Sequence, residues 1–557
     1  MALAALILLA AGAWLRFAHL GKLELFVDEG GHLFASIDAD ARPALDPIGE
    51  GKPGMLWVFR PAAWLPFDPL LTARASVAAG GLVTALALAT TLLLCFDAQA
   101  ALLGLLLWAF LPFAVFHERL ALLDPLIATS LACAIALAAL AAARPAASRL
   151  ALGLSFLAGG FAGAACLLKI SAVTAAPWLA IVYVALQQRF AKKLFDRRLA
   201  AFVAGCAAPL LCLVPDLAHL GTHLTRATGG QTTALLRLYF SHGGWLLVLL
   251  LLAALGAPWL ALVQAALRPP QASARRVRRI ALLMVGGVLL GLFVIGSLVH
   301  LAASPGTENA PPVPLVHTYF SFGGWPFALL LLVALGVAAA RPAPGAWSLG
   351  LAWLVSLLVA QIVFPSGYAR YLHGDYLPLV LFLAAALNRL TALPTAIVVG
   401  GAVATWAGTD HAIVRDPTHA GLPPGEIRQY VTGPWSGDGT RALTVFLEQH
   451  APCVVFAHPY SRAGSYATRL AARHNPAINF VPFVLEGPLA TGALRAATTR
   501  AHELFGPGIT IFVLAESDRP VPAEPALLRA GGIPFTTTFS HVKRDDLGSL
   551  LLLDCDL

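Results

Sequence analysis

The sequence predicts an all-α, multi-pass membrane protein with a small C-terminal α/β domain, and three observations lead to this fold class. Hydrophobic residues make up 58% of the 557 residues and charged residues only 12%, about half the charged fraction of a typical soluble protein. The apolar residues gather in runs of about 20, the length that a helix needs to cross a bilayer. After residue 408, charges, Pro and Gly return and the apolar runs shorten to strand length. These features argue against a cytosolic globular enzyme.

The chain begins with an apolar stretch, residues 1–20, which has neither a basic start nor a small-residue cleavage site. We therefore expect a retained first helix and not a signal peptide. Residues 21–69 follow as a first loop that is far longer than a simple connection. Its apolar residues around Trp57 and Trp64 predict short amphipathic helices along the membrane surface.

Twelve further spans complete a predicted set of 13. They lie near residues 70–95, 99–116, 124–143, 150–168, 170–188, 199–217, 243–267, 280–303, 323–340, 346–364, 376–390 and 391–408. With the N-terminus in the cytoplasm, the inner connections contain the basic runs 189–198 and 268–279 and only two acids, Asp97 and Asp196. This excess of Lys and Arg satisfies the positive-inside rule, and it places the C-terminal domain on the outer face.

Residues 409–557 predict the soluble domain, and residues 1–408 the membrane domain. Helices are expected at residues 443–449 and 489–504, and strands at 453–457, 509–514 and 548–553. Such alternation is typical of a small α/β or α+β unit. Cys453 and Cys555, the two cysteines outside the predicted spans, could pair in an oxidising compartment, and their spacing alone does not decide this.

A seven-residue motif occurs twice. Residues 239–245 read Tyr-Phe-Ser-His-Gly-Gly-Trp, and residues 319–325 read Tyr-Phe-Ser-Phe-Gly-Gly-Trp. We interpret both copies as helix openings at the outer interface, with an aromatic residue in the interfacial belt and a Gly-Gly entry. The alternative is that Tyr239, His242 and Tyr319 line the rim of a cavity.

Ionisable residues beside apolar spans mark functional sites by default, because they are costly to bury in a membrane. Four groups fall on the same, outer face under the predicted topology: Asp28, Glu29 and Lys52 in the first loop, Arg119 and Asp124 before the fourth span, Lys169 between two spans, and Arg370 with Tyr371 before a late span. We expect them to line one cavity. Two simpler interpretations stay open at this stage: Asp28-Glu29 could be a solvated acidic turn, and Arg119 could pair with Asp124.

A cavity with carboxylates and several cations suits a substrate that carries a lipid phosphate and an acceptor that carries a hydroxyl. An Asp would take the proton of the acceptor, while Lys and Arg would stabilise the charge on the departing phosphate. The reaction would be glycosyl transfer. Direct attack by the acceptor would invert the sugar, whereas a carboxylate nucleophile would retain its configuration.

With these residues, the chain resembles the GT-C glycosyltransferases that use polyprenyl-phosphate sugars, in particular bacterial members of glycosyltransferase family 39 and the lipid A aminoarabinose transferases. The resemblance covers residues 1–408 in order: an apolar first helix, Asp28-Glu29 in a long first loop, Lys52-Pro53 before an aromatic stretch, Arg119 with Asp124 five residues later, Lys169 after a span, and Arg370-Tyr371 leading to Pro378. Thirteen spans followed by an outward soluble domain are also the architecture of the aminoarabinose transferases.

The resemblance implies a role for each residue. Asp28, with Glu29 beside it, would be catalytic, and the donor phosphate and substrate would be bound by Lys52, Arg119, Asp124, Lys169, Arg370 and Tyr371. The family's Lys-Pro-Pro is Lys52-Pro53-Gly54 here, and its Thr-Lys-Gly is Leu168-Lys169-Ile170. Some relatives bind a divalent metal through Glu and His. Because Glu50 is two residues before Lys52 and not adjacent to it, we predict no metal and no other cofactor, and a divalent metal stays open as the alternative.

We therefore expect a membrane glycosyltransferase, hexosyl or pentosyl, in a bacterial inner membrane. Its partners would be a polyprenyl-phosphate-linked sugar, a lipid, protein or polysaccharide acceptor, and membrane lipids, but no nucleic acid. The main alternative is a multi-span transporter or flippase, which fits less well because transporters usually have paired halves with interrupted helices near the midplane. A third interpretation is a non-catalytic member of a cell-envelope assembly that binds through its outer domain.

Overall fold

The structure is a computed structural model of the whole chain. It describes all residues except 38–51, 53, 147, 191–195, 212–314, 342–344, 364–368, 434, 459–461, 485–489, 518–523, 531–532, 545–548 and 556–557. The predicted spans 243–267 and 280–303, the first copy of the repeated motif and the acidic residues 38–50 of the first loop therefore lie outside the described residues.

The chain divides into two compact units. The helical unit contains Met1–Ala18, Asp40–Val58 and Arg74–His411, and the C-terminal unit contains His19–Ala39, Phe59–Ala73 and Ala412–Leu557. Parts of the first loop thus fold with the C-terminal residues, to which they are distant in sequence.

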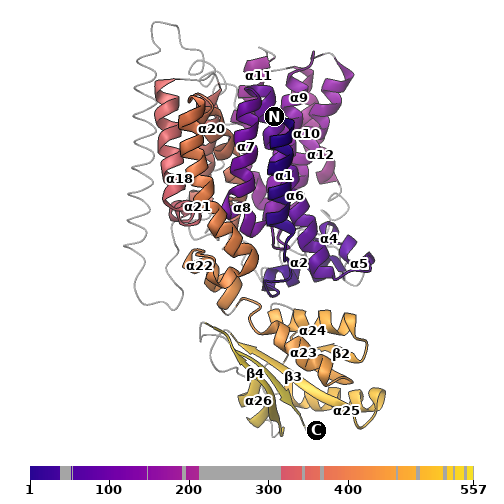
Figure 1. Cartoon of the computed structure of the whole chain (residues 1–557). Coiled ribbons are helices and arrows are strands. Elements are labelled where there is room, and N and C mark those ends of the chain that lie inside the picture. Colours follow the sequence, from indigo (N-terminus) through magenta and orange to yellow (C-terminus); the bar gives the residue numbers. More distant parts are fainter. Residues whose placement is uncertain are drawn as a thin grey trace. The chain divides into compact units, whose positions relative to one another are not determined.

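The helical unit is a bundle of apolar helices that run side by side (Figure 1). Its members are α1 (Ala2–Phe17), α4 (Met55–Val58), α6 (Pro69–Cys95), α7 (Ala98–Phe110), α8 (Pro112–His117), α9 (Leu123–Ala142), α10 (Arg149–Leu168), η1 (Ile170–Ala175), α11 (Ala176–Phe190), α12 (Arg197–Leu210), α18 (Leu315–Ala340), α19 (Ala346–Val363), η5 (Ala369–Asp375), α20 (Tyr376–Leu387) and α21 (Ala392–Arg415). In the described part of the chain, α6, α9, α10, α21 and residues 321–340 of α18 are long and apolar enough to cross a membrane. The predicted multi-pass helical fold is confirmed.

Two predicted spans are interrupted, for local reasons. The helix expected over residues 99–116 ends at Phe110, because Leu111 precedes Pro112 and is extended (φ −70°, ψ 112°), as residues before proline prefer. In the second copy of the repeated motif, the helix begins before the motif, at Leu315, and Gly324 (φ 59°) interrupts it. A second helical stretch begins directly after this glycine and runs to Ala340, close to the predicted span 323–340, although a first stretch already precedes the motif.

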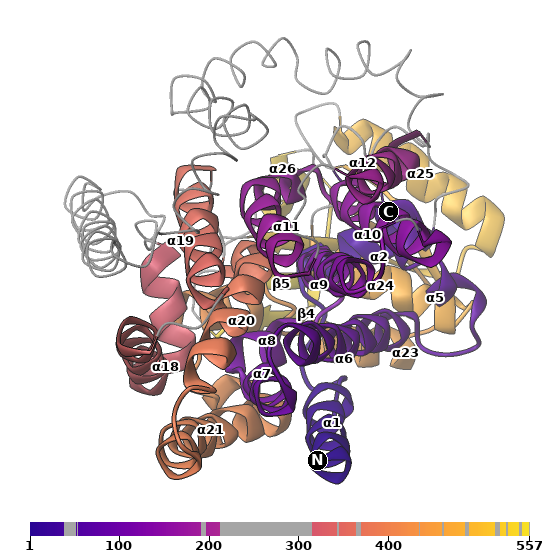
Figure 2. The same cartoon turned by 90° about the horizontal axis from the view of Figure 1, so that it is seen from above.

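Helix α20 lies at the centre of the bundle, as the view from above shows (Figure 2). All twelve of its residues are buried, which agrees with a helix that is apolar on every side. Helices α10 and α12 pack closely through small residues. A Cβ at Gly163 would lie 3.2 Å from Cys206 Cα, and small residues of this kind allow helix backbones to approach in a membrane.

The C-terminal unit contains a mixed five-stranded sheet with the order β2-β1-β3-β5-β4. The strands are β1 (Cys453–Ala457), β2 (Ile478–Pro482), β3 (Thr510–Ser517), β4 (Thr536–Val542) and β5 (Ser549–Asp554). Strands β1, β2 and β3 are parallel, and β5 is antiparallel to β3 and β4. The helices of this unit are α2 (Val27–Ile37), α5 (Pro61–Trp64), η6 (Pro417–His419), α22 (Pro424–Ile427), η7 (Arg428–Thr432), α23 (Thr440–Gln449), α24 (Ala463–His474), α25 (Ala490–Phe505) and α26 (Glu524–Ala530).

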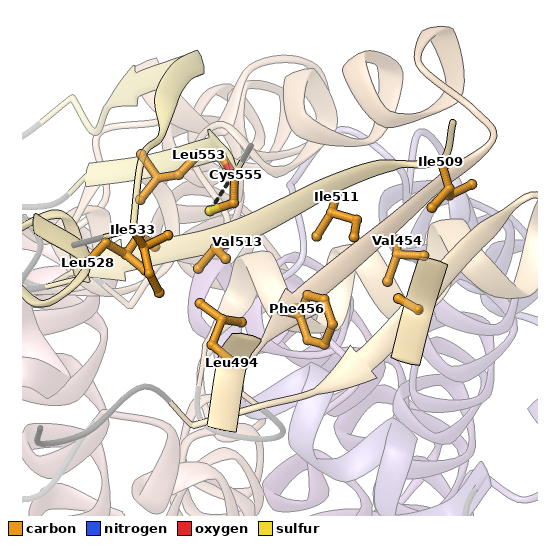
Figure 3. Close-up of a cluster of buried hydrophobic side chains, with 12 residues drawn as sticks. Val454, Phe456, Leu494, Ile509, Ile511, Val513, Leu528, Ile533, Leu553 and Cys555 are labelled. Atoms are coloured by element: carbon orange, nitrogen blue, oxygen red, sulfur yellow. Dashed lines mark hydrogen bonds between the residues drawn. The ribbon is translucent and has the colours of Figure 1, made fainter. Parts of the chain in front are cut away.

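Hydrophobic cores cover both faces of the sheet, so this unit has three layers. One core joins Phe456 and Val513 to Leu494 of α25 and Leu528 of α26 (Figure 3). The other joins Val455 and Phe512 to helices α23 and α24. The central strands are apolar on both sides, which explains their continuous hydrophobic runs and confirms the predicted α/β domain. Cys453 and Cys555 belong to opposite cores and are free thiols, so they do not form the disulfide that the sequence allowed.

Candidate functional site

Asp124 is the centre of the candidate site, and it joins cations from two distant parts of the helical unit. It lies in the first turn of α9. Lys169 Nζ is 2.8 Å from Asp124 Oδ1, and Arg370 Nε is 3.9 Å from Asp124 Oδ2. The three side chains are between 7% and 13% exposed. The structure thus brings three of the predicted site residues together.

The backbone at each position explains this convergence. Lys169 is extended (φ −158°, ψ 125°) and separates α10 from η1, so the charged residue lies at a break between two apolar helices. Arg370 lies in the short 3-10 helix η5, immediately before α20. Tyr371 adds an aromatic contact, since its ring centroid is 4.0 Å from Lys169 Nζ and 5.6 Å from Arg370 Cζ. A cation over an aromatic face is stabilised by the ring quadrupole.

A small cavity opens beside these residues. It measures about 30 Å³ and is lined by Asp124, Arg370, Tyr371, His373 and Asp375, among others. A space of this size holds one or two water molecules, or oxygen atoms of a bound group, but not a sugar ring. Lys169 and Arg370 both lie next to Asp124 here, and Asp375 adds a second carboxylate to the lining. The two cations can hold an anionic oxygen through charge-assisted hydrogen bonds.

The segment that carries Lys52 lies against the same break between helices. Gly54 N donates to Leu167 O at 2.7 Å. A Cβ at Gly54 would lie 2.9 Å from Leu168 Cα and 3.0 Å from Leu168 N, so a side chain would collide with the α10 backbone. Here Gly replaces the second Pro of the family pattern, and the close backbone contact explains why. It brings the loop of Lys52 to the end of the helix that precedes Lys169.

Arg119 has a different environment from Asp124. Its Nη1 donates to Leu15 O at 2.7 Å and to Arg16 O at 3.3 Å, at the C-terminal end of α1. A cation in this position satisfies carbonyls that have no partner within the helix and complements the helix dipole. Asp124 pairs with Lys169, so the simpler interpretation that Arg119 and Asp124 form the ion pair does not describe this structure.

Sequence reasoning missed a buried polar network behind the site. Glu118 is fully buried and accepts hydrogen bonds from Arg16 Nε at 2.5 Å and Trp108 Nε1 at 3.1 Å, and its Oε1 is 3.3 Å from His373 Nε2. Since His373 lies in η5 with Arg370, the network anchors the element that presents Arg370. Arg16 and Glu118 are 102 residues apart in the sequence. The sequence signal for this pair is that two charged residues occur beside apolar runs, where burying a charge is costly without a partner.

Asp28 and Glu29 belong to the C-terminal unit, in helix α2. Glu29 is fully buried, and its Oε2 accepts a hydrogen bond from Phe26 N at 3.1 Å, so this carboxylate caps the start of its own helix. Asp28 lies in the first turn and is partly exposed. Asp28-Glu29 is therefore part of a helix start and not a turn without structure.

Helix α2 is held against α24 of the same unit. The ring of Phe34 stacks on Tyr466 at 5.6 Å, and Arg469 Cζ lies 4.1 Å from the centre of the Phe34 ring. Gly30 faces the same tyrosine, and a Cβ at this position would come within 2.8 Å of Tyr466 Cβ and still closer to its ring. The helix that carries Asp28 is thus positioned by the α/β fold.

Among the described residues, no three or more His, Cys, Asp or Glu side chains are grouped as the ligands of a metal ion would be.

Comparison with protein families gives one match. Residues 48–218 match the model of the family described as dolichyl-phosphate-mannose-protein mannosyltransferase. This stretch contains Lys52, Arg119, Asp124 and Lys169, whereas Asp28 and Arg370 lie outside it. Over these residues, the match confirms the predicted resemblance to glycosyltransferases that use lipid-phosphate sugars. No curated protein matches the chain.

Solved structures show distant similarity. ArnT from Cupriavidus metallidurans bound to undecaprenyl phosphate is similar over 98% of this chain and 97% of its own, at 14% identity and a TM-score of 0.40. The apo oligosaccharyltransferase of Archaeoglobus fulgidus is similar over 94% of this chain and 70% of its own, at 13% identity and a TM-score of 0.46. Neither similarity places an individual residue of this chain.

Proposed function

We propose that this protein is a membrane glycosyltransferase that transfers a sugar from a polyprenyl-phosphate donor to a hydroxyl or phosphate of an acceptor. The reaction would take place at the outer face of a bacterial inner membrane, and the sugar would be a hexose or a pentose. The family match over residues 48–218 supports the class of reaction, and so does the undecaprenyl phosphate named for ArnT.

The observation that carries the proposal is the group of Asp124, Lys169 and Arg370. Two cations meet at Asp124 in a largely buried place, where Asp375 also lines the cavity. A lipid phosphate is the anion that a membrane supplies there, and Lys and Arg would stabilise its developing charge as the sugar leaves. Asp124 would keep the two cations in place before the donor arrives. Lys52, whose loop contacts the end of α10, would add a further cation.

Asp28 is the candidate general base. A partly exposed carboxylate in the first turn of a helix can accept the proton of an acceptor hydroxyl, and Glu29 holds the helix start by accepting a hydrogen bond from Phe26 N. The transfer step then forms a bond between the acceptor oxygen and the anomeric carbon and breaks the bond to the lipid phosphate. The proton passes to Asp28, and the leaving group departs as polyprenyl phosphate.

Binding of undecaprenyl phosphate to the purified protein tests the cationic group. Arg370→Gln and Lys169→Gln should each weaken binding by about tenfold, because each removes a charge-assisted contact. Arg341→Gln is the matched control, because Arg341 is an exposed arginine of the same unit whose guanidinium donates to Arg389 O. Equal affinities for all of these variants would refute the assigned phosphate site.

Sugar transfer tests the base. With a radiolabelled polyprenyl-phosphate sugar and a membrane extract as the source of acceptors, Asp28→Asn should abolish labelling while leaving undecaprenyl phosphate binding unchanged. Full transfer by Asp28→Asn would exclude Asp28 as the base. Movement of the labelled lipid across a vesicle membrane without transfer would instead support the transporter alternative.

A further inference from the structure

The C-terminal unit contains a large pocket that the proposed reaction does not use. It measures about 740 Å³, and all of its lining residues belong to this unit. Cavities of about 300 to 1,000 Å³ are typical of sites for small molecules and headgroups. Its walls combine the apolar side chains of Leu23, Pro417 and Val431 with several charged groups.

Four cations line the pocket, against three carboxylates: Lys22, Arg415, Arg441 and Arg544 against Glu24, Asp416 and Asp438. The carboxylates already have partners inside the protein. Asp416 accepts from the Thr418 hydroxyl and lies 2.8 Å from His419 Nδ1. Asp438 accepts from Arg544 N at 2.8 Å. Hydrogen bonds from Thr418 and His419 hold the pKa of Asp416 down at about 2, so this carboxylate stays ionised and engaged at neutral pH.

Glu24 is engaged in the same way. Its Oε2 accepts from the Thr440 hydroxyl and from Arg441 N, both at 3.0 Å. The Arg441 guanidinium donates to Gly21 O, and Arg544 Nε lies 3.5 Å from Asp438 Oδ1. Two cations of the pocket are thus accounted for. Within the described residues, Lys22 and Arg415 have no ion-pair partner.

The chain places these two cations at the ends of apolar helices. Arg415 is the last residue of α21, and Lys22 follows the end of α1 by five residues. Helix α21 is long and apolar enough to cross a membrane, and α1 is a shorter apolar helix. Basic residues just beyond such helices lie at the level of lipid headgroups. Along the chain, these two cations of the pocket therefore lie within five residues of the ends of two apolar helices.

We propose that this pocket binds a phosphate group, held between Lys22 and Arg415, in addition to the donor phosphate at Asp124, Lys169 and Arg370. Lys and Arg bind phosphate oxygens through charge-assisted hydrogen bonds. The apolar wall accommodates the part of the ligand to which the phosphate is attached. The phosphate can be carried by a lipid headgroup or can be free in solution, and the experiment separates these sources.

The test measures the rate at which a water-soluble amine reagent acylates Lys22 in the full-length protein, using peptide mass spectrometry. Arg495→Lys provides an internal reporter, because Arg495 is an exposed residue of α25 outside the pocket. The protein is placed in nanodiscs of phosphatidylcholine alone, of phosphatidylcholine with phosphatidylglycerol, or of phosphatidylcholine alone with millimolar inorganic phosphate.

We expect acylation of Lys22, relative to position 495, to slow by about tenfold in at least one phosphate arm, since one charge-assisted contact is worth roughly that factor. Protection by phosphatidylglycerol alone identifies a lipid source, and protection by inorganic phosphate identifies a free one. Arg415→Gln should remove most of the protection, whereas Arg500→Gln, an exposed arginine of α25 with the same change in charge, should keep it. Equal rates in all nanodiscs, or equal effects of the two substitutions, would overturn the proposal.

Discussion

At the scale of single residues, the cost of a charge in an apolar environment is the most informative signal in this sequence. It singled out Asp124, Lys169 and Arg370, which meet in the structure although they are separated by as many as 246 positions. It could not assign partners. Arg119 contacts the end of α1, and Asp124 pairs with Lys169, because the partner of a charge depends on packing that a linear pattern does not contain.

The pair of Lys169 and Asp124 should be energetically coupled. Because both side chains are mostly buried, removing one partner leaves a charge with a large desolvation cost. In a double-mutant cycle with Asp124→Asn and Lys169→Met, we expect a coupling energy of about 1 to 3 kcal/mol in the free energy of unfolding. Thermal or denaturant unfolding of the purified protein measures it. Strictly additive effects of the two substitutions would show that the 2.8 Å contact contributes no stability.

The cysteines allow a second test at this scale. Burial raises the pKa of the Cys453 thiol from 9.0 to about 11, so its thiolate fraction at pH 8 is about 0.1%. We expect negligible alkylation of Cys453 in the folded protein at pH 8, a rate that rises only as the pH approaches 11, and rapid reaction after unfolding. Peptide mass spectrometry after iodoacetamide treatment measures this. Rapid reaction of the folded protein at pH 8 would contradict the buried position of Cys453.

At the scale of elements, helix α2 shows how one glycine sets a packing distance. Gly30 allows α2 to lie against the Tyr466 ring, whereas a Cβ at the adjacent Gly31 would be 3.5 Å from Tyr466 Oη, an ordinary contact. In the sequence, Gly30 and Gly31 stand side by side directly after Asp28-Glu29, and nothing in this pattern distinguishes the two glycines. The packing partner was not predictable, because Tyr466 lies more than 400 positions away and helix α24 itself was not predicted.

Substitution of Gly30 and of Gly31 by alanine separates the close contact with Tyr466 from the general effect of glycine on helix stability. Gly30→Ala should destabilise the C-terminal unit by about 1 to 3 kcal/mol through overpacking against Tyr466. Gly31→Ala should be neutral or stabilise the helix by up to about 1 kcal/mol, because alanine is the better helix former. The midpoint of thermal unfolding distinguishes them. If both substitutions lowered the midpoint equally, the contact with Tyr466 would not explain the role of Gly30.

At the scale of the whole molecule, the fold class was predictable from the lengths of the apolar runs. A helix needs about 20 apolar residues to cross a bilayer, whereas a strand in a soluble sheet needs only about four to eight. The helix boundaries at residues 70–95, 124–143 and 150–168 were predicted to within a few residues, and β1 was predicted at its observed position. Strands β2 and β4 were missed. They lie on the edges of the sheet, where side chains are partly exposed and the hydrophobic pattern is weak.

The orientation across the membrane is a prediction at this scale. Alkaline phosphatase, which is active only outside the cytoplasm, should be active when fused after residue 557 and inactive when inserted in the connection between α9 and α10. The reason is the excess of Lys and Arg in the connections assigned to the inner side. Enzyme activity in whole cells, normalised to the amount of fusion protein, measures it. The reverse pattern would invert the topology and place the candidate base in the cytoplasm.

The membership of α2 in the C-terminal unit has a consequence for control of the reaction. If Asp28 is the base, then the base and the cations that stabilise the leaving group are mounted on separate bodies. A substitution deep in the sheet that unfolds the C-terminal unit would then abolish transfer, while the contacts of Asp124 with Lys169 and Arg370 in the helical unit stay intact.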